Sequence, residues 1–117
     1  MTKHNQQVGK WGEETAAQWL TEHGYEIIGQ NIRTPYGEID IIAKKDSILI
    51  FVEVKTLTSS KNFFPEQQIT KRKREHMLNA AQHYATENNI SHWQIDVIAI
   101  EGKQETKPKI THFENAI

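Results

Sequence analysis

The sequence predicts a single mixed α/β domain in which a central mixed sheet is flanked by two main helices. Short runs of β-branched and aliphatic residues separated by turn-forming residues indicate strands, and two longer segments repeat apolar residues at helical spacing. The predicted order is helix, three strands, helix, strand. The 117 residues suffice for one hydrophobic core but not for two. Within this domain, residues 1–7 are expected to form a flexible polar arm.

The composition is typical of a globular protein, with 25% charged and 37% hydrophobic residues. No apolar run is long enough to span a membrane and no cleavable signal pattern is present, so we expect a cytoplasmic protein without a membrane partner. The lack of cysteine excludes disulfides and thiolate zinc sites. The net charge of −1 argues against nucleic-acid binding through overall charge. However, residues 55–74 contain six basic residues and one acidic residue, a net charge of +5.

The first helix is predicted from Val8 to His23, and Gly24 is a natural C-terminal stop. Glu13 lies in line with small and apolar residues that should face the sheet, namely Ala16, Ala17 and Leu20. Gly9 and Gly12 disfavour a helix, which is understandable if its first turn passes close to other backbone or to a ligand. The alternative is a frayed helix start at which Glu13 only favours the N-terminal dipole.

Residues 25–33 are predicted as the first strand, and residues 34–37 as a turn. The stretch Gly37–Lys55 then indicates a β-hairpin, because two aliphatic runs are separated by the turn-forming residues 44–47. These apolar runs are interrupted by three charged side chains, Asp40, Glu53 and Lys55. Charges in a buried strand are unfavourable unless they are paired or bind a metal, so the hairpin is the leading candidate for a functional site.

Strand alternation decides which of these side chains share a face. Glu53 and Lys55 share one face, roughly 7 Å apart. In the first strand of the hairpin, acids and isoleucines alternate between the two faces in the order Glu38, Ile39, Asp40 and Ile41.

A two-residue turn at Asp46-Ser47 would set Asp40 directly opposite Glu53. A slip of one residue would separate them. Two close carboxylates repel each other, which raises one pKa unless a cation intervenes. Because all-oxygen ligands suit Mg²⁺ or Mn²⁺, these metals are the expected cofactors.

The second main helix is predicted from Glu66 to Asn88, with Pro65 at its start. Its first half carries four cations, Lys71, Arg72, Lys73 and Arg74. Such a run is usually a solvated helix face, but here it follows closely on the acidic hairpin, which favours contact with phosphates. Lys61 in the preceding loop belongs to the same candidate nucleic-acid surface. Phe63 and Phe64 in that loop would either stack on bases or anchor the loop to the core.

Trp93–Ile100 is predicted as a strand, and Lys109–Glu114 is a candidate edge strand. Asp96 is a further charge in an apolar run, and we interpret it as a capping or salt-bridge partner. The six histidines are scattered. His76 and His83 could share a helix face, but no metal-binding pattern is present, so the histidines are interpreted as structural or surface residues. No Gly-rich phosphate loop or nucleophile elbow occurs.

The ordered set of elements and charges resembles the core of the PD-(D/E)-x-K nuclease superfamily, which has the restriction-endonuclease-like fold. Within it, the chain resembles the YraN family of small bacterial proteins, which is similar to archaeal Holliday-junction resolvases. The residues that carry the resemblance are Gly9 to Glu13, Gly24-Tyr25, Asn31 to Arg33, Gly37 to Ala43, Phe51 to Lys55, Lys71 and Asp96-Val97.

The resemblance implies a metal-dependent endonuclease that acts on structured or branched DNA with Mg²⁺ or Mn²⁺. Asp40 and Glu53 would bind the metal, and Glu13 would help from the helix. Lys55 would orient the attacking water or stabilise charge on the phosphorane, and Lys71 would approach a phosphate. A resolvase needs two active sites, so a homodimer is compatible with the resemblance.

Three positions depart from the pattern. Ile39 stands where the superfamily has proline, Leu57 where an arginine is common, and Phe64 where a glycine is common. The last two concern DNA contacts more than metal binding.

Two other interpretations stay open. A nuclease-like domain could bind nucleic acid within a repair or recombination complex without cutting it, and would then need no Mg²⁺ affinity at Asp40 and Glu53. Alternatively, Asp40, Lys55 and Glu53 form a buried structural network, although such networks often add little net stability.

Overall fold

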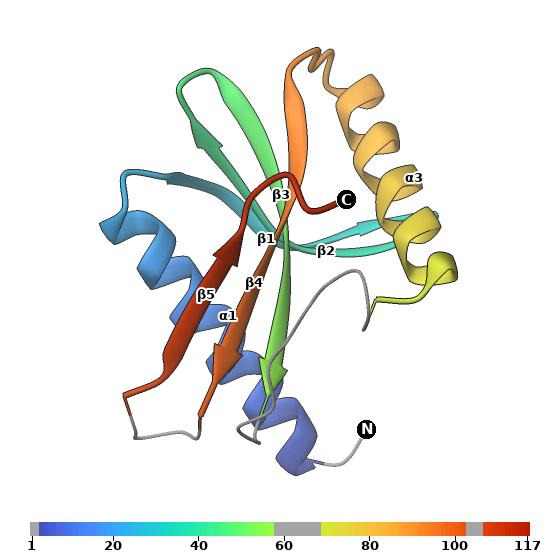
Figure 1. Ribbon diagram of the computed structural model, residues 1–117. Coiled ribbons are helices and arrows are strands. Elements are labelled where there is room, and N and C mark those ends of the chain that lie inside the picture. The colour runs from blue at the N-terminus through green and yellow to red at the C-terminus, as the bar shows by residue number, and fades with distance from the viewer. Residues whose placement is uncertain (1–2, 58–68, 103–106) are drawn as a thin grey trace.

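The computed structural model describes residues 3–57, 69–102 and 107–117, and side chains from residue 7 onward within these ranges. The described residues form two helices and a five-stranded sheet (Figure 1). The elements are α1 (Lys3–Glu22), β1 (Glu26–Thr34), β2 (Gly37–Lys45), β3 (Ile48–Leu57), α3 (Lys71–Glu87), β4 (Trp93–Glu101) and β5 (Lys109–Phe113). The predicted mixed α/β domain is confirmed, and the candidate edge strand extends the order to αβββαββ.

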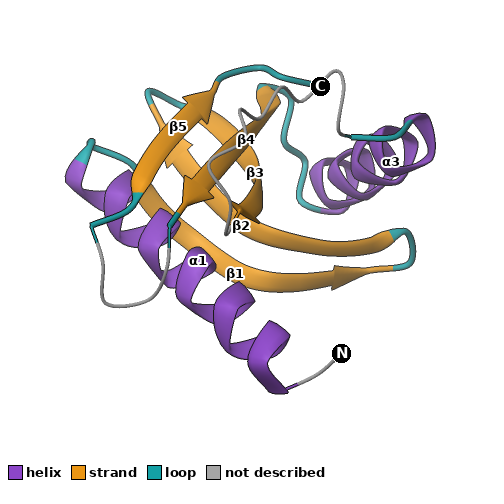
Figure 2. Cartoon of the chain, turned by 60° about the horizontal axis from the view of Figure 1, so that its bottom comes forward, coloured by secondary structure: helices purple, strands orange, loops and turns teal. Residues whose placement is uncertain are grey.

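The sheet has the strand order β1-β2-β3-β4-β5. Neighbouring strands are antiparallel except for β3 and β4, which run parallel. A parallel pair needs a crossover connection, and the segment containing α3 supplies it. Helix α1 covers one face of the sheet and α3 covers the other (Figure 2).

Small residues on both helices allow close packing on the sheet. Helix α1 buries Ala16, Ala17 and Leu20 against strand residues that include Ile41, Ala43, Ile50, Val52, Ile98 and Ile100. Helix α3 buries Ala80, Ala81 and Ala85 against Ile39, Ile42, Leu49, Phe51 and Ile95. The stripe predicted for the first helix therefore faces the sheet as expected, and it brings Glu13 to that interface.

Helix α1 begins at Lys3, five residues before the predicted Val8. Residues 3–7 are polar but contain neither glycine nor proline, so nothing in them ends the helix. A Cβ at Gly12 would overlap the hydroxyl of Thr56 on β3, which explains this glycine by close approach. Around Gly9, by contrast, no described atom lies within 4 Å of such a Cβ.

Asp96 on β4 is fully buried, and three groups bind its carboxylate. Gln94 donates from Nε2 at 2.9 Å, the backbone N–H of Asn115 at 2.8 Å, and Nε2 of His112 on β5 lies 2.7 Å away. The interpretation of Asp96 as a capping or salt-bridge partner is consistent with its hydrogen bonds to Asn115 and His112, through which the carboxylate holds β5 and the C-terminal segment on the sheet.

No helix in the described part of the chain is long and apolar enough to cross a membrane. The predicted helix from Glu66 is wrong at its N-terminal end, because Ile69 and Thr70 are not helical and Thr70 caps α3 at Lys71. Lys61 and residues 63–66 lie outside the described residues.

Candidate active site

The β2–β3 hairpin has the turn and register that the sequence predicts. Asp46 and Ser47 form the two-residue turn, with φ angles of 52° and 68°. Residues 41–45 pair with residues 48–52 in the antiparallel ladder. Continuing this register by one residue sets Asp40 beside Glu53.

The backbone ladder between β2 and β3 ends at Asp40. Oδ2 of Asp40 accepts a hydrogen bond from the backbone N–H of Val54 at 2.9 Å. The side chain of Asp40 thus takes the place of a backbone carbonyl. From Asp40 towards its N-terminal end, β2 bends away from β3 and towards α3 (Figure 1). Asp40 and Glu53 lie at the fork between the two strands.

The alternation of β2 side chains between the two faces of the sheet is interrupted at Asp40. Ile39 packs with Ile42 on the α3 face, whereas Ile41 packs on the α1 face. The prediction that Ile39 and Ile41 face the same way is therefore wrong. The reason is local: the ladder to β3 stops here, and Asn31 on β1 has a left-handed φ of 52°.

The carboxyl groups of Asp40 and Glu53 share a hydrogen bond at this fork. Burial raises the pKa of Asp40 from 3.8, and the charge of Glu53 raises it further, to about 8. The N–H of Val54 opposes this shift, and the more distant charge of Glu13 adds to it. At neutral pH a proton therefore sits between the two carboxyl groups unless a cation replaces it.

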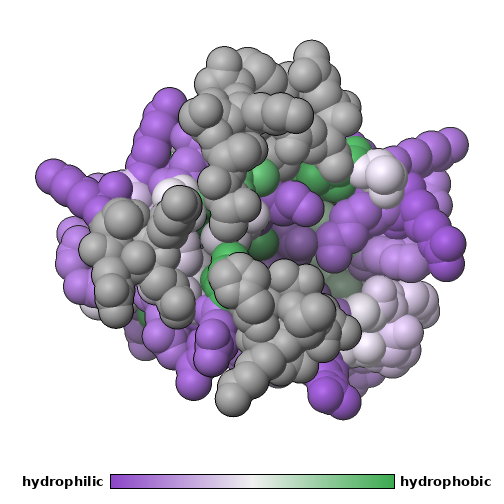
Figure 3. Space-filling view, turned by 90° about the horizontal axis from the view of Figure 1, so that it is seen from below, coloured by the Kyte–Doolittle hydropathy of each residue, from purple (hydrophilic) through white to green (hydrophobic). Residues whose placement is uncertain are grey.

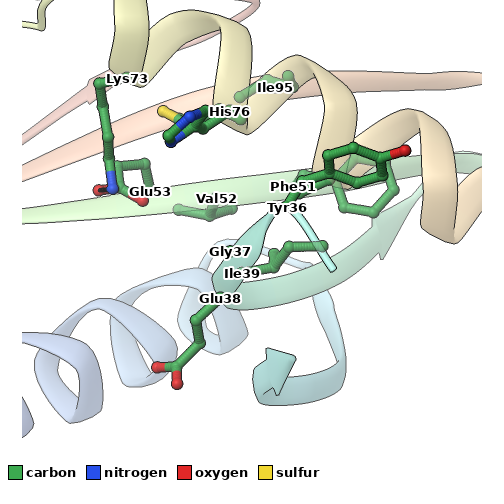
Figure 4. Close-up of a pocket in the computed structure, with 12 residues that line it drawn as sticks. Tyr36, Gly37, Glu38, Ile39, Phe51, Val52, Glu53, Lys73, His76 and Ile95 are labelled. Carbon is green, nitrogen blue, oxygen red and sulfur yellow. Dashed lines mark ion pairs between the residues drawn. The ribbon is translucent and has the colours of Figure 1, made fainter. Parts of the chain in front are cut away.

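Glu53 is paired with Lys73 of α3 and not with Lys55. Lys73 Nζ lies 3.3 Å from Oε1 of Glu53, whose side chain is 15% exposed (Figure 4). Lys55 is exposed and takes part in none of the ion pairs within the described ranges. The buried Asp40–Lys55–Glu53 network considered above is therefore not formed, although alternation keeps Lys55 on the face of Glu53.

Glu13 meets two residues of the β1–β2 hairpin that the sequence did not identify as site residues. With its amide oriented to donate, Asn31 Nδ2 lies 2.6 Å from Oε1 of Glu13 and 2.9 Å from Oε1 of Glu38. Figure 4 shows Glu38 directed towards α1 and away from Lys73. An asparagine tolerates the left-handed backbone that this bridge requires.

Electrostatics link this second group of acids to the first. Burial raises the pKa of Glu13, and the charges of Glu38 and, more weakly, Glu53 raise it further, while the hydrogen bond from Asn31 lowers it. The structure thus brings Asp40 and Glu53 into contact and places Glu13 nearby, joined to Asn31 and Glu38. The one sequence feature that indicates the bridge between Glu13 and Glu38 is an asparagine, Asn31, within the predicted first strand.

The first turn of α3 presents the predicted basic residues, Lys71, Arg72, Lys73 and Arg74. Thr70 caps the helix, and its side chain accepts from the backbone N–H of Lys73 at 3.1 Å. Each cation at the positive end of a helix dipole destabilises the helix by roughly 0.3–1 kcal/mol. Helix stability therefore does not explain this cluster, whereas contact with an anion would. Lys61 lies outside the described residues.

The carboxylates of Asp40 and Glu53 suit a hard cation whose remaining ligands are waters or phosphate oxygens. Within the described ranges, no three His, Cys, Asp or Glu side chains are grouped closely enough to hold a metal on their own. Mg²⁺ needs only one or two carboxylates, because waters and substrate phosphates complete its shell. The Asp40–Glu53 pair fits this requirement, and a divalent cation would relieve the repulsion between the two groups.

Comparison with known proteins identifies the family. Residues 12–100 match the model described as "Uncharacterised protein family UPF0102". A UPF0102 protein of Syntrophotalea carbinolica is 38% identical over 118 residues, covering 99% of this chain and 95% of the relative. Another, from Syntrophomonas wolfei, is 40% identical over 114 residues, covering 96% and 98%. The chain therefore belongs to the UPF0102 family, the one that the sequence motifs identified as YraN.

Proposed function

We propose that this protein is a Mg²⁺- or Mn²⁺-dependent endonuclease that hydrolyses phosphodiester bonds in structured or branched DNA. The observation that carries the proposal is the contact between the carboxyl groups of Asp40 and Glu53, where burial and the charge of Glu53 raise the pKa of Asp40 to about 8. Such a pair is unfavourable for folding by itself, and a bound cation would account for it.

The arrangement of the elements supports the same conclusion. A restriction-endonuclease-like core carries an acid on its second strand and Glu-x-Lys on its third, beside an acidic helix. Here Asp40 lies on β2, Glu53 and Lys55 on β3, and Glu13 on α1. The order αβββαββ and the mixed sheet are compatible with that core.

Each side chain has a defined part in the proposed reaction. Asp40 and Glu53 would hold the metal ion, which when bound supplies a hydroxide nucleophile and neutralises phosphate charge. Lys55 would stabilise the charge that develops on the reacting phosphate. When DNA binds, Lys73 would release Glu53 and pair with a phosphate oxygen instead. Glu13, oriented by Asn31, would help to bind the metal or its water.

The basic turn of α3 would bind the DNA backbone. Lys73 connects this turn directly to Glu53 at 3.3 Å, so the cations and the acidic pair border one surface. Because the chain as a whole has a net charge of −1, DNA binding must depend on this local cluster and should weaken steeply with salt.

A second candidate is a nucleic-acid-binding module that does not cut. The pairing of Glu53 with an ammonium group favours it, because Lys73 already supplies a cation at this carboxylate. A metal titration separates the two candidates, since a pure binding module needs no Mg²⁺ affinity at Asp40 and Glu53.

The proposal is tested by incubating Holliday junctions, flaps and supercoiled plasmid with Mg²⁺ or Mn²⁺. We expect cleavage by the wild-type protein, background cleavage by Asp40→Asn and Glu53→Gln, and full activity of Glu87→Gln, an exposed acid on α3. Cleavage that both site variants retain at the wild-type rate would contradict the proposed site.

A further inference from the structure

A cavity opens beside Glu53 between the β1–β2 turn, β3 and α3. Its volume is about 80 Å³, below the roughly 300–1,000 Å³ of pockets that enclose a drug-sized ligand, so it suits one small group that enters from the open mouth. Its apolar lining comprises Ile39, Phe51, Val52, Met77, Ala80 and Ile95. Figure 3 shows this end of the molecule as a hollowed face on which hydrophilic side chains surround recessed hydrophobic ones.

Glu53, Lys73 and His76 line one end of the cavity and offer both hydrogen-bond donors and acceptors. Glu38 also lines the cavity, but its carboxylate is directed towards α1. In the view of Figure 4 the Glu53–Lys73 pair lies at one end of the cavity, and the aromatic rings of Tyr36 and Phe51 lie towards the other.

Tyr36 is an exposed aromatic residue held in place at the rim. The residue is 48% exposed, so its ring is accessible to a ligand at the mouth of the cavity. The turn that carries it is fixed by Thr34, whose hydroxyl donates to the carbonyl of Gly37 at 2.7 Å and accepts from the N–H of Tyr36 at 3.1 Å. An edge contact with His83 at 6.0 Å between ring centroids orients the ring further.

We infer that this cavity binds one unpaired nucleobase of the DNA, next to the phosphate that is hydrolysed at the Asp40–Glu53 pair. A nucleobase has apolar aromatic faces and a polar edge, which match the apolar lining and the polar side of the cavity. A phosphate does not fit the apolar part, because burying its charge there would be unfavourable. The placement next to a reacting phosphate rests on the proposed function.

The position of the cavity defines the substrate more closely. Glu53 belongs both to the cavity and to the acidic pair, so a base in the cavity and its own backbone phosphate would engage adjacent groups. A base inside a continuous duplex cannot enter without being unpaired and unstacked. Substrates with unpaired nucleotides at the site, such as flaps, gaps and single strands, should therefore be preferred over perfect duplex.

The two methionines of the chain provide a selective probe of the cavity, because Met77 lines it and Met1 is the only other. The full-length protein is labelled with [¹³C-methyl]methionine, and Met77→Leu assigns the Met77 signal. The protein is then titrated in EDTA with a short single-stranded thymidine oligonucleotide, and with the same oligonucleotide in which abasic sites replace the bases. We expect the thymidine oligonucleotide to shift the Met77 methyl signal and the abasic one not to shift it.

Two rim variants complete the experiment. Tyr36→Ala should weaken thymidine-oligonucleotide binding about 5- to 100-fold, the range of one base–aromatic stack. Leu78→Ala removes an exposed side chain of α3 that does not line the cavity, and it should bind normally. An unmoved Met77 signal, an equal shift with the abasic oligonucleotide, or the absence of any binding would overturn the inference.

The outcome separates this inference from the nuclease proposal because no cleavage is measured in EDTA. Base-dependent shifts of Met77 without cleavage in Mg²⁺ would support the base pocket and argue against the nuclease. Cleavage in Mg²⁺ together with a Met77 signal that the thymidine oligonucleotide does not shift would support the nuclease and overturn the base pocket.

Discussion

The replacement of Asp40 by asparagine should change how stability depends on pH. Asparagine has nearly the same shape as a protonated aspartic acid, so it can still accept from Val54 and donate to Glu53. It cannot ionise. The variant therefore removes the titration of this one group while preserving the contacts that Asp40 makes at the fork.

The magnitude follows from the pKa of Asp40, which is 3.8 ordinarily and about 8 in the folded protein. Because the folded-state pKa is raised, the stability that Asp40 contributes is fully present below pH 3.8 and is lost as the pH rises through 8. Between pH 6 and pH 8 this linkage removes about 2 kcal/mol from the free energy of unfolding of the wild type. The difference in the free energy of unfolding between Asp40→Asn and the wild type should therefore grow by about 2 kcal/mol from pH 6 to pH 8, in favour of the variant.

Urea unfolding in EDTA, followed by tryptophan fluorescence from pH 6 to pH 9, measures this difference. The six histidines titrate in both proteins, so the difference between the two profiles isolates Asp40. Glu87→Gln, at an exposed acid, serves as the control and should follow the wild type. Parallel profiles for the wild type and Asp40→Asn would refute the raised pKa and, with it, the strained carboxyl pair.

Three further perturbations test the fold and the basic surface. Gly12→Ala should lower the free energy of unfolding by about 1–3 kcal/mol through overpacking, whereas Gly9→Ala should raise it by up to about 1 kcal/mol; equal effects in chemical denaturation would contradict the close approach of α1 to the sheet. His112→Ala should cost about 3–5 kcal/mol because it leaves the buried carboxylate of Asp96 short of a partner, and a loss below 1 kcal/mol would show that the pair is dispensable. Lys73→Gln should change stability by less than about 1 kcal/mol but reduce the salt dependence of DNA binding by about one phosphate contact, and an unchanged salt slope would exclude Lys73 from the DNA surface.

The hairpin could be predicted from the sequence because its geometry obeys local rules. Alternation and a two-residue turn at Asp46-Ser47 fix the pairing of residues 41–45 with residues 48–52, and this register brings Asp40 to Glu53. Both rules depend only on neighbouring residues, so a single sequence contains enough information for them.

Contacts between distant elements could not be predicted in the same way. The pairing of Lys73 with Glu53 depends on how the crossover places α3 on the sheet, and four neighbouring cations were equally plausible partners. The Asn31 bridge depends on a left-handed residue and on the change of alternation at Asp40, both of which violate the regular strand pattern used for prediction.

Calorimetric titration of Mn²⁺ and Mg²⁺ into the DNA-free protein tests the proposed metal site most directly. We expect one divalent ion to displace the proton of Asp40, so that binding weakens about 50-fold from pH 8 to pH 6 as the ionised fraction falls, and we expect no binding to Asp40→Asn or Glu53→Gln. Wild-type affinity in both variants, or a wild-type protein that binds neither metal at pH 8, would contradict a metal centre at the fork between β2 and β3.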